Sequence, residues 1–165
     1  MKILKIALFI DVENYKEPLN LFQQFSNDLN SYGKVIRKIA IGGWGFNKNL
    51  ENWKPLCIEQ NIEMHGYYEF KGKNAADRAI ISNAMKLLKA NTINAVAIYS
   101  RDTGFAIGFA ALKVFGATVI VPKMDNEFIP DANLYIKVNR DKLLISNPTT
   151  ELGKKLMKAL PNFFI

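Results

Sequence analysis

Short apolar runs alternate along the chain with stretches whose apolar residues recur at helical spacing. The runs predict β-strands near residues 4–10, 35–41, 62–68, 95–99, 118–121 and 134–138. Between them, the helical spacing predicts helices near residues 19–29, 50–60, 75–88 and 105–115. Because strands and helices alternate, the order predicts a three-layer α/β/α fold with a mostly parallel central sheet.

Several local expectations follow from single residues. We expect Gly33 to end the first helix and Pro122 to end the strand that begins at Thr118. The helix at 105–115 is apolar enough to be largely buried. Thr149 or Thr150 is expected to cap a final basic helix. The predicted organisation is one domain over residues 1–140 and a C-terminal tail, 141–165, whose short basic helix packs on that domain.

Composition supports one folded domain. The chain has 165 residues, of which 49% are hydrophobic, enough for a sizeable core. No apolar run approaches the roughly 20 residues that cross a bilayer. The apolar start is interrupted at Lys5 and ended by Asp11 with no cleavage site, so we interpret it as a buried strand and expect a cytoplasmic protein without membrane contact. The net charge of +7 favours a polyanionic partner, although a generally basic surface would give the same value.

The chain contains one cysteine, Cys57, and one histidine, His65. A single cysteine excludes a disulfide framework within the chain and a zinc site built on several thiolates. A single histidine excludes a site built on several histidines. We expect both residues to be structural.

Three aspartates are the candidate chemical groups. Asp11 directly follows the first predicted strand, and Asp102 follows the fourth. Ligands of parallel sheets bind beyond the carboxyl ends of the strands, so the two meet there if these strands are neighbours. Asp77 lies in the first turn of its helix, on the inward stripe of Ala84 and Leu88. Asn14 is placed to orient a water or ligand from the same edge.

Each aspartate also has a simpler interpretation. Asp11 and Asp102 are suited to capping the helical turns that follow them, and Asp77 to pairing with the helix dipole. Three convergent carboxylates, however, repel one another unless a cation lies between them, and hard oxygen ligands suit Mg²⁺ or Mn²⁺. The sequence has no phosphate-binding loop, GxGxxG, GxSxG or Cys–His pair that would offer other chemistry.

The same residues lie within motifs that resemble a known family. Phe9-Ile10-Asp11-Val12-Glu13-Asn14 is similar to the opening "F-[IV]-D-x-x-N" of NYN-domain proteins, a branch of the PIN-like nucleases. Ala75-Ala76-Asp77 resembles their "x-V-D" helix start. The segment from Tyr99 to Phe105 resembles "S-G-D-x-D-F", and Gly116 to Ile120 resembles the following "G-x-x-V" strand. The resemblance runs over roughly residues 3–138.

This resemblance implies a PIN-like fold and an Mg²⁺- or Mn²⁺-dependent ribonuclease. It implies metal ligands at Asp11, Asp77 and Asp102, with Asn14 assisting catalysis. The chain departs from the family pattern where Gly104 and Asn83 replace aspartates and where Arg101 replaces a glycine. These departures are expected to weaken the metal site, although Asn83 and Thr103 retain neutral oxygens.

Basic and aromatic residues are the candidates for contacting a nucleic acid. The expected phosphate-binding rim lies at the same sheet edge and comprises Lys71, Lys73, Arg78, Arg101, Thr103 and Lys123. The segment from Gly42 to Phe46 and the pair Tyr67-Tyr68 offer rings on which unstacked bases could lie. Trp44 and Phe46 stay candidates for stacking, whereas Tyr67 is expected to be an ordinary core aromatic. A solvated rim and packed aromatics are the alternative interpretation.

Three functions are compatible with the sequence. The first is a metal-dependent ribonuclease that cleaves phosphodiester bonds with metal-activated water. The second is a catalytically degenerate nucleic-acid-binding or regulatory module of the same fold. The third is a hydrolase of small phosphate esters. The expected partner is nucleic acid, in particular RNA, and a homo-oligomer is left open.

Overall fold

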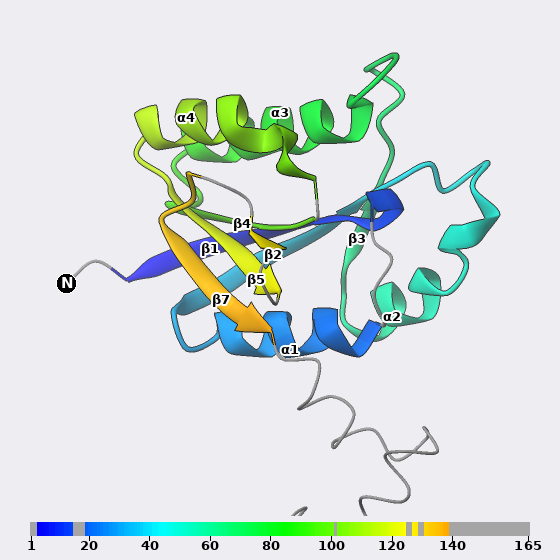
Figure 1. The fold of residues 1–165 in the computed structure, drawn as a ribbon, viewed down its shortest axis with the longest axis horizontal. Helices are drawn as coiled ribbons and strands as arrows, with labels where there is room; N and C mark the ends of the chain where they lie inside the picture. Colours follow the sequence, from blue (N-terminus) through cyan, green and yellow to red (C-terminus); the bar gives the residue numbers. More distant parts are fainter. Residues whose placement is uncertain (1–2, 15–18, 101, 125–126, 129–130, 139–165) are drawn as a thin grey trace, which may run out of the picture.

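The computed structural model describes residues 3–14, 19–100, 102–124, 127–128 and 131–138. It has a central sheet with two helices on each face, as Figure 1 shows. The α/β class and the mostly parallel sheet predicted from the sequence are confirmed. No helix in the described ranges is both long and apolar enough to cross a membrane.

The sheet contains seven strands and the two faces carry four α-helices within the described residues. The strands are β1 Leu4–Asp11, β2 Gly33–Ile41, β3 Glu63–His65, β4 Ala95–Tyr99, β5 Thr118–Met124, β6 Glu127–Phe128 and β7 Leu134–Val138. The helices are α1 Leu19–Leu29, α2 Trp53–Glu59, α3 Ala75–Lys89 and α4 Ala106–Val114. Three short 3₁₀ turns cover Val12–Asn14, Lys48–Leu50 and Thr103–Phe105.

The order of the strands places a crevice at the middle of the sheet. Six strands run parallel in the order β3-β2-β1-β4-β5-β7, and the two-residue β6 pairs antiparallel with the end of β5. From β1 the chain builds outward through β2 to β3, and then returns to place β4 on the other side of β1. In open α/β sheets such a reversal is the usual place for a ligand, between the carboxyl ends of the two central strands.

The central strand β1 is buried on both faces, and its side chains alternate between two cores. Ile6, Leu8 and Ile10 pack into the core that includes α1 and α2. Ala7 and Phe9 pack into the core that includes α3 and α4. Because side chains alternate along a strand, Asp11 falls on the face of Ala7 and Phe9, which is the face of α3.

Two predicted strand limits are wrong. The third strand has three residues rather than seven, because only Glu63–His65 pair with β2 and the chain then turns away as a loop toward α3. The fifth strand continues through Pro122 to Met124. Pairing between β4 and β5 ends at Ile120. Pro122 lies beyond this pairing, so its lack of a backbone N–H removes no hydrogen bond to β4.

The helix predictions need smaller corrections. Gly33 is the first residue of β2, paired with Leu4, and does not simply end α1. The predicted helix at 50–60 is a 3₁₀ turn followed by the shorter α2. The helix α4 is buried on one side only and not largely buried, since Ile107 is 88% and Val114 83% exposed. The predicted final helix and the boundary at residue 140 lie outside the described residues.

Candidate functional site

Two aspartates lie at the carboxyl ends of the central strands β1 and β4. Asp11 is the last residue of β1 and is 2% exposed. The hydroxyl of Ser100, which directly follows β4, donates to Asp11 Oδ2 at 3.0 Å and accepts from the backbone N–H of Asp102 at 3.0 Å. The neighbouring strands therefore connect the two aspartates through one serine.

Asp102 also caps the turn that follows it. Its Oδ1 accepts from the backbone N–H of Gly104 at 2.8 Å. The expectation that Asp102 caps the following turn is therefore confirmed. Because the cap uses Oδ1, the carboxylate is held in a fixed orientation at the edge of the crevice.

Asp77 reaches the crevice from α3. The buried residues Ile80, Ala84 and Leu88 form the stripe by which α3 packs on the sheet, and Asp77 occupies the first turn of that stripe. It is 8% exposed, and its Oδ2 is buried with no hydrogen-bond partner among the described residues. A buried carboxylate oxygen without a partner is energetically unfavourable, and a bound cation, a water or a proton would stabilise it.

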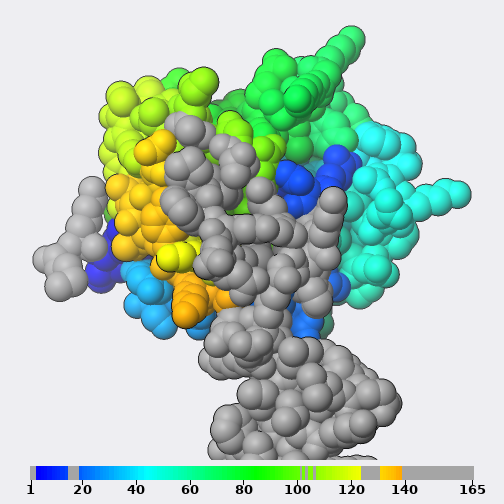
Figure 2. Space-filling view, in the orientation of Figure 1, coloured from blue at the N-terminus to red at the C-terminus, as the bar shows by residue number. Residues whose placement is uncertain are grey.

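These carboxylates share one pocket of about 260 Å³. Its walls include the three aspartates Asp11, Asp77 and Asp102 together with Glu13, Asn14 and Tyr67. On the face shown in Figure 2, the N-terminal segment (blue) reaches the surface between the green segment that enters α3 and the cyan segment after β2. The structure thus brings together the four residues predicted to be catalytic, while their roles stay predictions.

The electrostatics of the pocket disfavour so many charges without a cation. Burial, followed by hydrogen bonding to and repulsion by Asp102, raises the pKa of Asp77 to about 8. Burial, opposed by the Ser100 hydrogen bond and reinforced by Asp102, raises the pKa of Asp11 to about 6. None of the described residues that line the pocket is lysine or arginine. The site therefore lacks an internal counter-charge within the part of the chain described.

The donor set fits a hard divalent cation. All candidate ligands are carboxylate oxygens, and one of them is buried without a partner. In the described ranges, no three or more histidine, cysteine, aspartate or glutamate side chains form a ready-made metal site. Magnesium commonly uses only one or two carboxylates and keeps several waters, so a pocket lined by these aspartates still suits it.

A fourth carboxylate, Glu13, was not singled out from the sequence as a site residue. Its Oε1 accepts from the backbone N–H of Gly43 at 2.7 Å, and its Oε2 accepts from the Tyr67 hydroxyl at 2.8 Å. Burial, followed by the bond to Glu13, raises the pKa of Tyr67 to about 12, so the hydroxyl remains a donor. Glu13 thereby joins two loops at the pocket, and Tyr67 is a pocket residue rather than an ordinary core aromatic.

Ser100 is a second residue that sequence reasoning missed. The serine lies within the segment that resembles a family motif, and its position one residue after β4 was the available signal. Alternation along β4 places Val96 and Ile98 in the core under α3, so Ser100 continues on the face of Asp11. The local sequence, however, does not show which strand lies beside β4.

The predicted basic rim is only partly assembled. Lys71 and Lys73 are exposed on either side of Gly72, which lines the pocket. Arg78 turns back onto its own loop, where its guanidinium lies 5.1 Å from the Phe70 ring centroid. Lys123 is exposed on β5. Arg101 and the side chain of Thr103 lie outside the described part of the structure.

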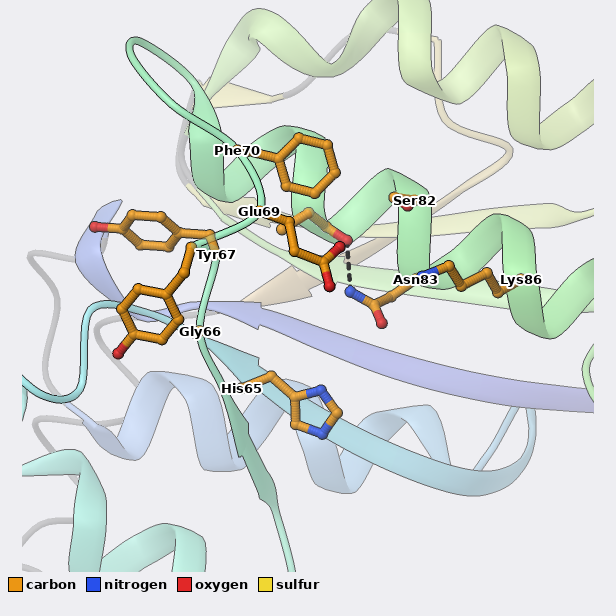
Figure 3. Close-up of a pocket in the computed structure, with 10 residues that line it drawn as sticks. His65, Gly66, Tyr67, Glu69, Phe70, Ser82, Asn83 and Lys86 are labelled. Atoms are coloured by element: carbon orange, nitrogen blue, oxygen red, sulfur yellow. Dashed lines mark hydrogen bonds between the residues drawn. The ribbon is translucent and has the colours of Figure 1, made fainter.

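Two departures from the family pattern are located by the structure. Asn83 does not line the acidic pocket but a second pocket, where its Nδ2 donates to the Ala79 carbonyl oxygen at 2.8 Å (Figure 3). It is therefore not placed to supply the oxygen that we expected from it. Gly104 is exposed next to Asp102, with no side chain to replace the expected carboxylate.

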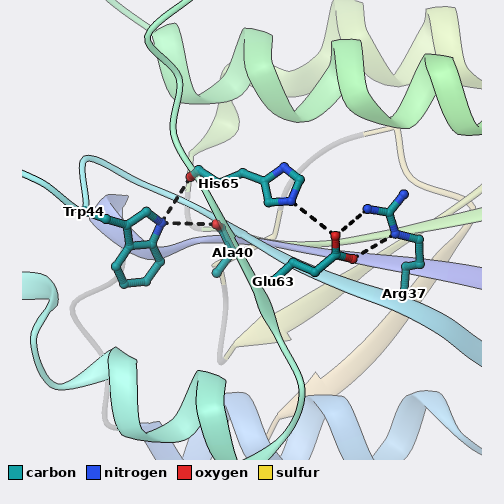
Figure 4. A network of polar contacts seen from close by, with 5 residues as sticks. All are labelled: Arg37, Ala40, Trp44, Glu63 and His65. Carbon is teal, nitrogen blue, oxygen red and sulfur yellow. Dashed lines mark hydrogen bonds and ion pairs between the residues drawn. The ribbon is translucent and has the colours of Figure 1, made fainter.

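The other residues considered from the sequence are two stacking candidates, Trp44 and Phe46, and two expected structural residues, His65 and Cys57. The Trp44 indole N–H donates to the carbonyl oxygens of Ala40 and His65, as Figure 4 shows, which fixes the orientation of the ring; its role in stacking on a base stays a prediction. His65 contacts Glu63, which in turn pairs with Arg37 at 2.6 Å. Cys57 is 1% exposed in the core, and burial raises the pKa of its thiol to about 11. Phe46 is 63% exposed and remains a candidate for contact with a ligand.

Comparison with known proteins places this geometry in a family. No curated protein sequence gives a significant match. A crystal structure of a protein of unknown function, VPA0982 from Vibrio parahaemolyticus RIMD 2210633, superposes with a TM-score of 0.64 at 15% identity, over 84% of this chain and 95% of that one. This likeness concerns the fold alone. The family model of the NYN domain matches residues 5–139, which include all three aspartates. The chain therefore belongs to the NYN domain family, within the PIN-like nuclease superfamily.

Proposed function

We propose that this protein is a divalent-metal-dependent ribonuclease whose site is the pocket of Asp11, Asp77 and Asp102. The observation that carries the proposal is the buried, unpartnered Oδ2 of Asp77 beside two further carboxylates. PIN-like nucleases typically use divalent metals, and Mg²⁺ or Mn²⁺ would relieve both the repulsion and the missing contact.

The chain's own residues hold and orient the acidic groups. Ser100 keeps one oxygen of Asp11 in place, and the Gly104 N–H keeps one oxygen of Asp102 in place. These hydrogen bonds orient both carboxylates at the pocket, where both side chains could act as metal ligands. A bound Mg²⁺ or Mn²⁺ would supply an activated water and would neutralise charge at the phosphate.

Charge and position support RNA as the proposed substrate. The net charge of +7 favours a polyanion, although the pocket itself is acidic. Lys71 and Lys73 flank the pocket residue Gly72, where they would contact phosphates on either side of the one being cut. An acidic centre within a basic molecule suits a phosphodiester chain better than a small neutral substrate.

A second candidate function is a nucleic-acid-binding module without catalysis. The structure gives it one specific argument, because Asn83 faces a different pocket and Gly104 has no carboxylate. Both departures therefore remove potential ligands from the acidic pocket. We rank the nuclease first because Asp77 places a buried, unpartnered carboxyl oxygen beside two further carboxylates, an arrangement that a bound cation would stabilise.

Cleavage of a labelled single-stranded RNA separates the two functions. We expect the wild type to cleave the RNA with Mn²⁺ or Mg²⁺ and not with chelator. Asp102→Asn should not cleave it. This variant should still bind RNA, because the amide keeps the shape of the side chain and removes the charge that repels phosphate. Asp28→Asn, on α1 at the opposite face of the sheet, is the matched control and should cleave normally. RNA binding without cleavage by the wild type would support the binding module instead.

A further inference from the structure

A second pocket of about 280 Å³ lies next to the acidic one. One wall is the segment from His65 to Phe70, and the other is the exposed flank of α3 (Figure 3). Tyr67 lines both pockets, so a ligand that extends out of the acidic pocket past this tyrosine would reach the second one. This second pocket is not used by the proposed chemistry.

The helix wall is polar and has a regular spacing. Ala79, Ser82, Asn83 and Lys86 lie at positions i, i+3, i+4 and i+7 of α3 and therefore share one face, separate from the stripe that carries Asp77. Ala79 leaves room because its side chain is small. The Asn83 Nδ2 is used by the Ala79 carbonyl oxygen at 2.8 Å, and Figure 3 shows the amide oxygen directed away from that bond.

The loop wall is aromatic, and its rings are held in place. Tyr68 is 65% exposed, yet its ring lies directly over Gly66, where an added Cβ would be 2.1 Å from the ring. Tyr67 and Tyr68 lie with ring centroids 6.4 Å apart at 29°. Tyr67 is itself fixed by its hydrogen bonds to Glu13. An exposed ring with restricted motion is a good surface for stacking a base.

The polar groups indicate what kind of ligand would fit. Glu69 and Asn83 both line this pocket, and each side chain carries an acceptor oxygen. Lys86 offers donors at the rim. A carboxylate in the wall disfavours a bare phosphate, whereas two acceptors beside a flat aromatic surface suit a planar ring that carries an amino group.

We propose that this second pocket binds one unpaired nucleobase with an exocyclic amino group, belonging to the same RNA whose phosphate enters the acidic pocket. Tyr68 supplies the stacking surface, and Asn83 and Glu69 accept from the amino group. The inference rests on the proposed function, since it assigns this base to the nuclease's substrate. Because Tyr67 lines both pockets, we expect the cleaved bond to lie a constant number of nucleotides from the bound base.

An abasic scan tests the base pocket without requiring cleavage. A short labelled single-stranded RNA is made with one abasic nucleotide moved along its length, and anisotropy measures its binding, with Mn²⁺ present, to protein that carries Asp102→Asn and so should not cleave it. One position should weaken binding about tenfold, as loss of one stacked base does. Replacing cytidine by uridine at that position should weaken it as well, because uracil lacks the amino group.

Variants then connect the sensitive position to this pocket. Tyr68→Ala and Asn83→Ala should each weaken binding of the intact RNA, while Tyr68→Ala should lose nothing further on the RNA that is abasic at the sensitive position. Tyr32→Ala is the matched control, because Tyr32 is 43% exposed at the opposite edge of the sheet. Circular dichroism of each variant checks that it is folded. We expect Tyr68→Ala to fold normally, because Tyr68 is largely exposed.

The results separate this inference from the proposed nuclease activity. Equal binding of all abasic RNAs, or an additive loss for Tyr68→Ala on the abasic RNA, would overturn the base pocket even if metal-dependent cleavage is observed. Equal binding of cytidine and uridine would remove the amino-group readout. A single sensitive position that depends on Tyr68, in a protein that never cleaves RNA, would keep the base pocket and reject the nuclease.

Discussion

The hydroxyl of Ser100 donates a hydrogen bond of 3.0 Å to Asp11 across the boundary between β4 and β1. The two residues are 89 positions apart in the chain. This bond lowers the pKa of Asp11 and so opposes the effect of burial, which raises it. Ser100 therefore keeps a buried carboxylate closer to the ionised form that a metal ligand needs.

Removing this hydroxyl should weaken metal binding without removing a ligand. In Ser100→Ala the pKa of Asp11 should rise further, so that Mn²⁺ must displace a more tightly held proton. We expect about 10-fold weaker Mn²⁺ binding at neutral pH, as is usual for partners of metal ligands. Calorimetry at pH 6 and 8 measures it, and the deficit should shrink at the higher pH. An unchanged affinity at both pH values would show that Ser100 does not support Asp11.

Neutralising Asp77 should stabilise the metal-free protein at high pH. Its pKa lies at about 8 in the folded state against an ordinary value of 3.8, so the folded protein holds a proton that the unfolded chain releases. The resulting destabilisation is absent below pH 3.8 and grows as the pH rises toward 8. Asp77→Asn should therefore raise the free energy of unfolding by about 1–3 kcal/mol at pH 8.

Urea unfolding of both proteins in chelator, at pH values from 4 to 8, checks this difference. The two curves should coincide near pH 4 and diverge as the pH increases. Asp28→Asn should follow the wild type throughout. A gain from Asp77→Asn that is equally large at pH 4 would point to a packing effect rather than to relief of a buried charge.

The contact between Glu13 and Tyr67 should couple the two loops at the pocket. Tyr67→Phe removes the donor to Glu13, and Glu13→Gln removes the charge that receives it. Each substitution should cost about 1–2 kcal/mol of stability, because the hydrogen bond involves a charged, part-buried group. The double variant should cost less than the sum of the two. Strict additivity in chemical denaturation would show that the contact contributes little.

Restoring a carboxylate at position 104 should strengthen the metal site. The backbone of Gly104 is not in the left-handed region, so a residue with a side chain is compatible there. An added Cβ would lie 3.0 Å from Asp102 Oδ1, which requires a small movement of that side chain. We expect Gly104→Asp to bind Mn²⁺ at least several-fold more tightly than Gly104→Ala. If both variants bind equally, the family's extra aspartate does not act on this site.

Local sequence was sufficient to predict the parts of the fold that depend on neighbouring residues. The strand from Ala95 to Tyr99 and the helix from Leu19 to Leu29 have the predicted limits, because a continuous apolar run or a regular apolar stripe defines each of them. Asp77 was correctly expected to face inward, since Ala84 and Leu88 on the same stripe are buried.

Relationships between distant residues were not accessible in this way. That β4 lies beside β1 depends on how the whole sheet assembles, and Ser100 became visible as a partner of Asp11 only with that pairing. Tyr67 lies 54 residues from Glu13, and the sequence placed it within the predicted strand at 62–68 rather than in a loop. The limited length of β3 reflects pairing with β2, not the composition of the run.

Calorimetric titration with Mn²⁺ tests the central claim, that Asp11, Asp77 and Asp102 form a cation site, most directly. Wild type and Asp28→Asn should bind with the same affinity, which we expect to be modest because Gly104 supplies no carboxylate. Asp77→Asn and Asp11→Asn should each bind at least about tenfold more weakly, since each replaces a charged oxygen ligand by a neutral amide. Equal affinity in wild type and Asp77→Asn, or no saturable binding by the wild type, would contradict the account.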